Sequence, residues 1–214
     1  MQYIIYFLLY IYIVYSLHII RSKVRNFYLA DLIRTVIFFS PFILPIYYYG
    51  LPSFDINTHN NYMYLLAIIP SFVFLIYQLP SYKIFFNKEM LLFFMPKVTF
   101  SDVLRNSYSL IGSVFMEELF FRSMIPESNI IIECITSGIL FSIAHYFIPK
   151  IRKEYTFKSY VYLFVLSVFW YISYKLSGSI MPAILAHALY NSPRFIIVSY
   201  QYLLQKKEYK NELS

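Results

Sequence analysis

Long apolar segments alternate with short polar ones along most of the chain. The apolar segments are rich in Ile, Leu, Phe and Tyr and cover residues 2–20, 33–50, 62–80, 106–125, 132–148, 158–176 and 180–203. A stretch of about 18 or more apolar residues with few charges is long enough to cross a bilayer as a helix. The pattern therefore predicts an all-α protein, a polytopic integral membrane helix bundle with about seven transmembrane helices.

Residues 81–105 interrupt this alternation. They combine Lys83, Lys88, Lys97 and Arg105 with the apolar run MLLFFM, which is too short to span a bilayer. We interpret this segment as an amphipathic piece at the membrane interface. The chain is accordingly divided into N-terminal membrane helices of unassigned role (1–100), a second set of helices (101–205) and a tail (206–214).

Composition and charge placement agree with a membrane protein. Hydrophobic residues make up 59% of the chain and charged residues 14%, against about 45–50% and 25% in soluble domains. The net charge is +7, but Lys and Arg gather in alternate short segments, and LPSFDINTHNN, PESN and LSGS contain none. This asymmetry predicts an outside N-terminus and a cytoplasmic C-terminus. On this interpretation the basic residues set the orientation of the chain in the lipid bilayer, and we expect no binding to nucleic acid.

Three further features of the sequence bear on location and on covalent structure. The first twenty residues lack a basic start and a small-x-small cleavage site, so we expect a retained first span and not a cleaved signal peptide. Cys134 is the single cysteine, which excludes an intrachain disulfide. The small size and the frequent Ile, Tyr, Phe, Lys and Asn favour an AT-rich bacterial source, and hence a bacterial cell membrane.

Ionisable side chains inside membrane spans are costly and therefore mark candidate functional sites. One predicted span carries Glu117, Glu118 and Arg122, the next carries His145, and the last carries His187. Glu118 and Arg122 are four residues apart and can pair on one helix face. Glu117 is rotated by about 100° from Glu118, so we expect it to face the interior of the bundle.

The histidines have neighbours at helical spacing. His187 and Asn191 are four residues apart, so both can point at one spot, and Phe141 can pack beside His145 one turn later. His145 reaches the depth of Glu117, near mid-membrane, only if its helix begins near Glu133. If the helix begins at Asn129 instead, we expect His145 to lie too close to the cytoplasmic side. We interpret Glu133 itself as an interfacial or loop residue.

A carboxylate, two imidazoles and a carboxamide converging in a dry site suit hydrolysis of an amide. Glu117 would act as general base on a water that His145 also holds. His187 and Asn191 would donate hydrogen bonds to the oxyanion that forms. The pair of Glu118 and Arg122 would hold the helix in place.

The motifs Glu117-Glu118-x-x-x-Arg122, Phe141-x-x-x-His145 and His187-x-x-x-Asn191 occur in order on separate predicted spans. In this the chain resembles the CAAX prenyl protease 2 and Abi (CPBP, bacteriocin-processing) family of intramembrane glutamic endopeptidases. The resemblance covers roughly residues 103–195 and implies that 101–205 is the catalytic core, which a cytoplasmic tail follows at 206–214. It implies that Glu117 and His145 activate water and that His187 and Asn191 form the oxyanion site. The implied substrate is a membrane-bound protein or peptide, in peptide or bacteriocin maturation, in bacteriocin immunity, or in C-terminal processing.

Alternatives to this reading remain open. We expect no cofactor, but Glu117, His145 and His187 are also a possible zinc ligand set. A non-catalytic immunity or scaffold protein of the same fold would use the same residues for contacts between helices. A transporter would predict an inverted repeat, which the spans do not show. Arg194, which follows Pro193 in the last span, is interpreted as marking a kink or a snorkelling position.

Overall fold

The computed structural model describes residues 2–23, 29, 32–33, 36–37, 50–56 and 61–212. All regular secondary structure in this part of the chain is helical, as predicted. The α-helices are α1 (Gln2–Lys23), α3 (Tyr62–Tyr82), α4 (Phe100–Glu118), α5 (Ile130–Tyr146), α6 (Pro149–Glu154), α7 (Phe157–Ser177) and α8 (Met181–Glu212). Three short helices of other types are η1 (Lys83–Phe86), η2 (Met90–Phe94) and η3 (Leu119–Ser123).

Two of the described helices, α3 and α7, are each 21 residues long and apolar enough to cross a membrane. Shorter apolar stretches, Gln2–Ser16 and Ile130–Tyr146, fall in α1 and α5. The predicted span at 33–50 lies almost wholly outside the described residues. By length and composition these helices agree with a membrane protein, and the count of about seven spans stays a prediction.

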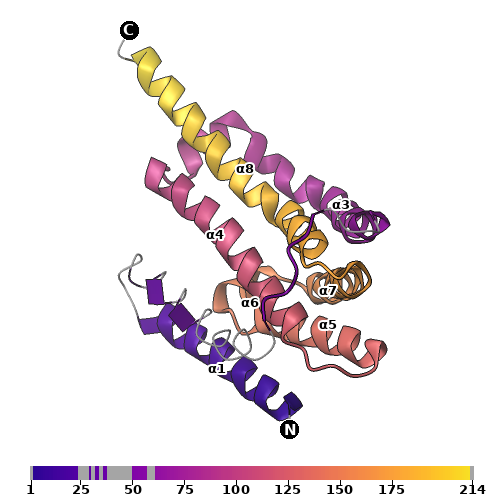
Figure 1. Cartoon of the computed structure of the whole chain (residues 1–214). Coiled ribbons are helices and arrows are strands. Elements are labelled where there is room, and N and C mark those ends of the chain that lie inside the picture. Colours follow the sequence, from indigo (N-terminus) through magenta and orange to yellow (C-terminus); the bar gives the residue numbers. More distant parts are fainter. Residues whose placement is uncertain are drawn as a thin grey trace.

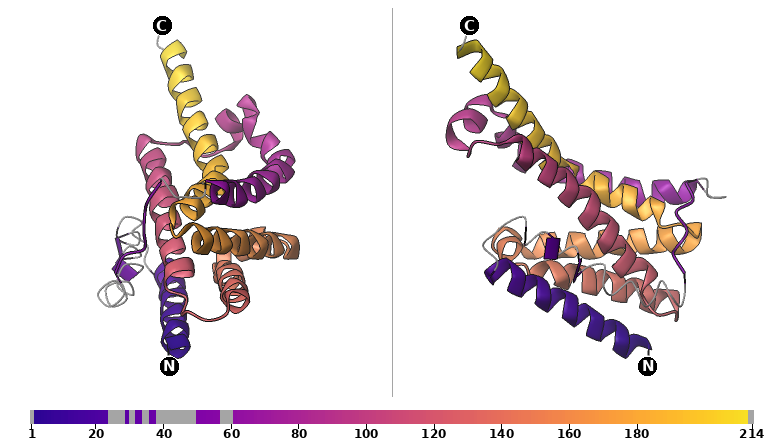
Figure 2. Two further views of the ribbon diagram at one scale, coloured as in Figure 1. Left: turned by 45° about the vertical axis from the view of Figure 1, so that its right-hand side comes forward. Right: turned by 60° about the vertical axis from the view of Figure 1, so that its left-hand side comes forward.

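The bundle is built around α7, which packs against α3, α5 and α8, while α4 lies along α8 (Figure 1). The buried side of α7 carries Leu166, Trp170 and Tyr171, each fully enclosed. Two views show α4 crossing the bundle obliquely beside α8 (Figure 2). Large aromatic side chains that are buried in this way contribute strongly to packing.

α5 and α7 approach closely because small residues lie between them. A Cβ atom added to Gly138 would come within 2.7 Å of the Phe164 ring. The Ser142 hydroxyl donates to the backbone carbonyl of Tyr160 at 2.9 Å. Small residues of this kind let two membrane helices pack backbone to backbone.

α1 packs against the end of α4 and against α5. Tyr6 stacks on Phe120 with ring centroids 5.1 Å apart. The Tyr10 hydroxyl donates to the backbone carbonyl of Leu140 at 3.1 Å, and that of Tyr3 to the carbonyl of Pro126 at 3.1 Å. These contacts fix α1 to the part of the chain that carries the candidate site.

The segment 83–98 is attached to the C-terminal half of α8 by hydrogen bonds to its backbone. The buried Gln201 side chain donates to the carbonyls of Leu91 at 3.0 Å and Pro96 at 2.9 Å. Gln205 accepts from the backbone N–H of Val98 at 2.9 Å. The segment is thus built into the protein, and its predicted place at a membrane interface stays a prediction.

α4 begins with a capping box. The Thr99 hydroxyl accepts from the Asp102 N–H at 3.2 Å, and the Asp102 carboxylate accepts from the Thr99 N–H at 2.8 Å. The backbone N–H and hydroxyl of Thr99 hold the pKa of Asp102 below its usual range, with a smaller contribution from Arg105. Reciprocal capping of this kind fixes where the helix starts.

Candidate active site

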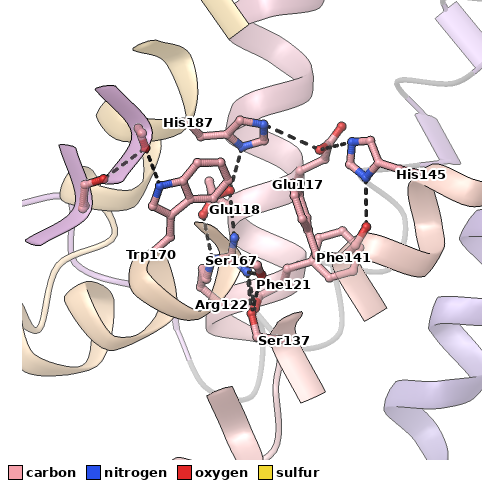
Figure 3. Close-up of polar contacts among 12 residues, drawn as sticks. Glu117, Glu118, Phe121, Arg122, Ser137, Phe141, His145, Ser167, Trp170 and His187 are labelled. Carbon is pink, nitrogen blue, oxygen red and sulfur yellow. Dashed lines mark hydrogen bonds and ion pairs between the residues drawn. The ribbon is translucent and has the colours of Figure 1, made fainter. Parts of the chain in front are cut away.

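Glu117 and Glu118 occupy the last two positions of α4, where the helix widens into the π-helical turn η3. Such turns are rare and often occur at functional sites. The two carboxylates point in different directions, as predicted (Figure 3). The side chain of Glu118 is fully buried, whereas that of Glu117 lies between two histidines and is 19% exposed.

The predicted ion pair between Glu118 and Arg122 is present and bidentate. Nε of Arg122 donates to Oε2 of Glu118 at 2.8 Å, and Nη2 donates to Oε1 at 3.2 Å. The remaining acceptors of the guanidinium are the carbonyl of Phe121 at 3.1 Å and the hydroxyls of Ser137 and Ser167. A buried charge is tolerated when it is paired and hydrogen-bonded in this way.

His187 is held on two sides. Its Nδ1 lies 2.7 Å from Oε1 of Glu118, and its ring stacks on Trp170 with centroids 4.5 Å apart. The Trp170 indole N–H donates to the hydroxyl of Ser71 at 2.9 Å, which fixes the indole in turn. Since the Glu118 carboxylate is an acceptor, Nδ1 of His187 carries a proton. Nε2 of His187 then points at Glu117, 3.9 Å from its Oε2.

His145 approaches Glu117 from the other side (Figure 3). Its Nδ1 lies 2.9 Å from the carbonyl of Phe141, and its ring packs on the fully buried Phe141 ring at 4.7 Å, as predicted. A carbonyl only accepts, so Nδ1 donates and Nε2 presents a lone pair. That Nε2 is 4.0 Å from Oε2 of Glu117.

Of the two starts considered for the helix of His145, the structure has the earlier one. α5 begins at Ile130 with Asn129 as its N-cap, and not near Glu133. His145 nevertheless reaches Glu117, because α4 crosses α5 obliquely and equal residue counts do not mean equal depth (Figure 2). His145 is the penultimate residue of α5, so the cluster lies toward the end of the bundle where α6 begins.

Glu133, interpreted from the sequence as an interfacial or loop residue, lies in a helix and not in a loop. Glu133 is 2% exposed and lies in the first turn of α5. Its carboxylate accepts from the Tyr171 hydroxyl at 2.8 Å, pairs with Lys175 at 3.2 Å and accepts from the N–H of Ser128. These contacts tie the 126–129 loop to α7, on the side of the bundle away from His145.

Asn191 follows His187 by one turn of α8 and is half-buried. Within the described part of the chain its side chain forms no hydrogen bond. The helical spacing places it on the face of α8 that His187 uses. The structure thus brings Glu117, His145 and His187 together and leaves Asn191 beside them, with its predicted role untested.

Sequence reasoning did not identify the residues that surround the ion pair. Trp170, Ser137 and Ser167 lie in apolar helices, where a serine usually indicates close helix packing. Trp170 is the only tryptophan of the chain, which was the one signal available. Its contact with His187 depends on how α7 and α8 are placed relative to each other, which spacing within one helix does not give.

Two of the separations among these three donor atoms are longer than those around a bound zinc ion. Ligands held at about 2.1 Å around a tetrahedral zinc are roughly 3.4 Å apart. Here Oε2 of Glu117 is 4.0 Å and 3.9 Å from the two imidazole Nε2 atoms. No group of three or more His, Cys, Asp or Glu among the described residues is placed to hold a metal ion.

Comparison with known proteins gives one match. Residues 101–193 match the family described as type II CAAX prenyl endopeptidase, Rce1-like. No curated protein and no solved structure matches the chain. The matched residues run from the first turn of α4 into α8 and include all residues of the cluster.

Proposed function

We propose that this chain, which carries an Rce1-like domain of the type II CAAX prenyl endopeptidase family at residues 101–193, is an intramembrane endopeptidase. Its substrate would be a peptide bond of a membrane-associated protein or peptide. The reaction would be hydrolysis by a water that Glu117 and His145 activate. Peptide or bacteriocin maturation, bacteriocin immunity and C-terminal processing are the roles that such a reaction serves.

The observation that supports this proposal best is the position of Glu117 between two imidazoles. The separations of 4.0 Å and 3.9 Å from Oε2 to the Nε2 atoms are too long for direct hydrogen bonds. Two acceptors bridged by one water through hydrogen bonds of about 2.8 Å lie roughly 4–4.5 Å apart, so the separation of Glu117 and His145 would admit a bridging water. It would donate one hydrogen to each and keep a lone pair for attack.

The chemical steps follow from these positions. Glu117 takes a proton from the water as its oxygen attacks the scissile carbonyl, which gives a tetrahedral oxyanion. With Nδ1 of His187 donating to Glu118, a protonated His187 has Nε2–H free to donate to that oxyanion, and the carboxamide of Asn191 is the second donor. Collapse breaks the C–N bond, and Glu117 returns the proton to the leaving amine.

Glu118, Arg122 and Trp170 position the reacting groups and do not touch substrate. Glu118 and the indole of Trp170 hold the ring of His187 between them. Arg122 holds Glu118 and binds across to α5 and α7 through Ser137 and Ser167. A site supported in this way keeps its geometry within the small tolerance that catalysis requires.

The test is the Glu117→Gln variant, which keeps the volume of the side chain and removes the base. We expect its rate of peptide hydrolysis in lipid vesicles to fall by about 10²–10⁴-fold, the usual contribution of a general base. Products are identified by mass spectrometry of membrane peptides. Glu127→Gln, in the exposed loop after η3, is the matched control and should keep full activity.

Two outcomes would change the conclusion. If Glu117→Gln still processes peptides at the wild-type rate, the chain is not a glutamate-type protease, and a non-catalytic immunity or scaffold role replaces it. A chelator should leave wild-type activity unchanged. Loss of activity that added zinc restores would favour the metal mechanism instead.

A further inference from the structure

Ser71 is a buried polar residue on the side of α3 that packs against α7. α3 is predominantly apolar, and Ala67 and Ser71 are its two fully buried residues. The helix ends at Tyr82 and therefore lies outside residues 101–193, the range that matches the family model. The sequence alone assigns no role to the helices of this part of the chain.

The Ser71 hydroxyl takes part in two hydrogen bonds. It donates to the backbone carbonyl of Ala67 at 3.0 Å, one turn earlier in α3. Its oxygen accepts from the indole N–H of Trp170 at 2.9 Å. An indole N–H can only donate, and the Trp170 side chain is fully buried. Ser71 therefore supplies the acceptor that this buried donor requires.

Trp170 transmits this constraint to His187. The indole and imidazole rings stack with centroids 4.5 Å apart and planes inclined by 20°. Glu118 holds one edge of the imidazole, with its Oε1 at 2.7 Å from Nδ1. A single hydrogen bond leaves a ring free to turn about that contact, and the stacked indole removes this freedom. The direction in which Nε2 of His187 points thus depends on the position of the indole.

The same face of α3 makes a second contact in this region. Gln78 follows Ser71 by seven residues, which leaves the two side chains roughly 20° apart around the helix axis. The Gln78 amide donates to the hydroxyl of Tyr190 at 2.8 Å. The Tyr190 ring meets the Trp170 ring edge-on, with centroids 6.4 Å apart. α3 therefore holds the indole directly through Ser71 and borders it through Tyr190.

We propose that Ser71 is a positioning residue of the active site and acts on His187 through the indole of Trp170. This inference rests on the proposed function, and it gives a helix outside the family domain a part in the same reaction. Without the hydroxyl, the indole N–H would be a buried donor that lacks an acceptor, which is unfavourable. The indole would turn toward another acceptor, and Nε2 of His187 would lose its fixed direction.

The experiment compares Ser71→Ala with wild type, both as the full chain in lipid vesicles. The substrate is a membrane-anchored peptide that the wild type cleaves. We expect kcat to fall about 10- to 100-fold, because a small misplacement of a reacting group has an effect of this size. KM should change by less than about twofold, since the loss is confined to the transition state. Ser71→Thr keeps the hydroxyl and should retain most of the activity.

Ser173→Ala is the matched control. Ser173 is also fully buried, lies three residues after Trp170 in α7 and donates to the backbone carbonyl of Met63 in α3. Its substitution removes a hydrogen bond between the same two helices and leaves the acceptor of the indole in place. It should lower the thermal stability as Ser71→Ala does, and it should leave kcat unchanged.

Tryptophan fluorescence measures the position of the indole without any need for activity. Trp170 is the only tryptophan of the chain, so the emission comes from this ring alone. A stacked imidazole quenches an indole, and His187→Ala therefore gives the emission of the released ring. Ser71→Ala should raise the emission toward that value, whereas Ser71→Thr and Ser173→Ala should keep the emission of wild type.

A double variant tests whether the effect passes through the indole. Trp170→Phe keeps an aromatic ring beside His187 but has no N–H group. In this background Ser71→Ala should cause no further loss of kcat, because the hydrogen bond that it removes is already absent.

Three results would overturn the inference. Equal losses of kcat in Ser71→Ala and Ser173→Ala would mean that α3 acts by packing alone. Wild-type emission in Ser71→Ala would mean that the hydroxyl does not hold the indole. An equal effect of Ser71→Ala in wild type and in Trp170→Phe would mean that it acts by another route. If wild type cleaves no peptide, the proposed function fails, and the emission of Ser71→Ala still decides whether Ser71 holds the indole on His187.

Discussion

Glu117 and Glu118 are adjacent in the sequence but have opposite surroundings. The Glu118 side chain is fully buried and accepts hydrogen bonds from Arg122 and His187, so both of its carboxylate oxygens already have partners inside the protein. Glu117 is partly exposed and lies beyond hydrogen-bonding distance of both histidines. The first arrangement stabilises a structure, and the second leaves a carboxylate available to react.

This difference predicts different costs for the same substitution at the two positions. Glu118→Leu would leave Arg122 as an unpaired buried cation, so we expect it to destabilise the protein by about 3–5 kcal/mol. Glu117→Leu removes no hydrogen bond found among the described residues and should change stability by less than about 1 kcal/mol. Thermal unfolding in detergent, followed by circular dichroism, measures both.

A double variant tests the cause. If the loss in Glu118→Leu comes from the stranded guanidinium, then Glu118→Leu combined with Arg122→Leu should recover a large part of it. Equal stability of the single and double variants would mean that the contact of Glu118 with His187, and not the ion pair, carries the cost.

Residue spacing within one helix could be interpreted correctly from the sequence, and contacts between helices could not. The pair of Glu118 and Arg122 and the contact of Phe141 with His145 both follow from a spacing of four residues. The burial of Glu133 depends on where α7 places Tyr171, which lies far away in the sequence. No local pattern encodes the relative register of two helices.

At the scale of helices, the apolar pattern predicted where most elements lie, but not their ends. The predicted span at 106–125 corresponds to α4 together with η3. α4 begins earlier than predicted, at Phe100, because Thr99 and Asp102 form its N-terminal cap. The last predicted span, 180–203, continues as α8 to Glu212. Hydropathy reports where a helix is apolar, whereas capping and side-chain contacts decide where it stops.

The close contact between α5 and α7 predicts that two Gly→Ala substitutions will differ in their effect on stability. Gly138→Ala would place a Cβ atom 2.7 Å from the Phe164 ring and 3.1 Å from its backbone oxygen. We expect this overpacking to destabilise the protein by about 1–3 kcal/mol, more than alanine gains in helix propensity. Gly112→Ala in α4 is the matched control, since its nearest neighbour is the Tyr108 ring at 3.7 Å.

The control should be neutral or slightly stabilising, by up to about 1 kcal/mol. Both variants are compared with wild type by thermal unfolding under the same detergent conditions. Equal stability of Gly138→Ala and Gly112→Ala would show that α5 and α7 do not approach as closely as the structure has them.

At the scale of the whole molecule, the loops separate into two ends of the bundle (Figure 2). At one end, the N–H of Ile180 donates to the carbonyl of Ser53 at 3.0 Å, and Tyr3 bonds to Pro126. The other end holds the segment 83–98, α6 and the C-terminal part of α8, which together carry most of the lysines. The charge asymmetry seen in the sequence is thus an asymmetry of the folded bundle.

This separation predicts which positions can be reached from outside a cell. In a Cys134→Ser background, single cysteines replace Leu51 and Glu127 at one end, and Lys153 and Lys207 at the other, all exposed. The positive-inside rule predicts that a membrane-impermeant maleimide labels the first pair on intact cells and the second pair only after the membrane is opened. Labelling of the second pair alone would invert the orientation. Labelling of both pairs on intact cells would mean that the two ends lie on the same side of the membrane. The bundle would then not span the membrane as proposed.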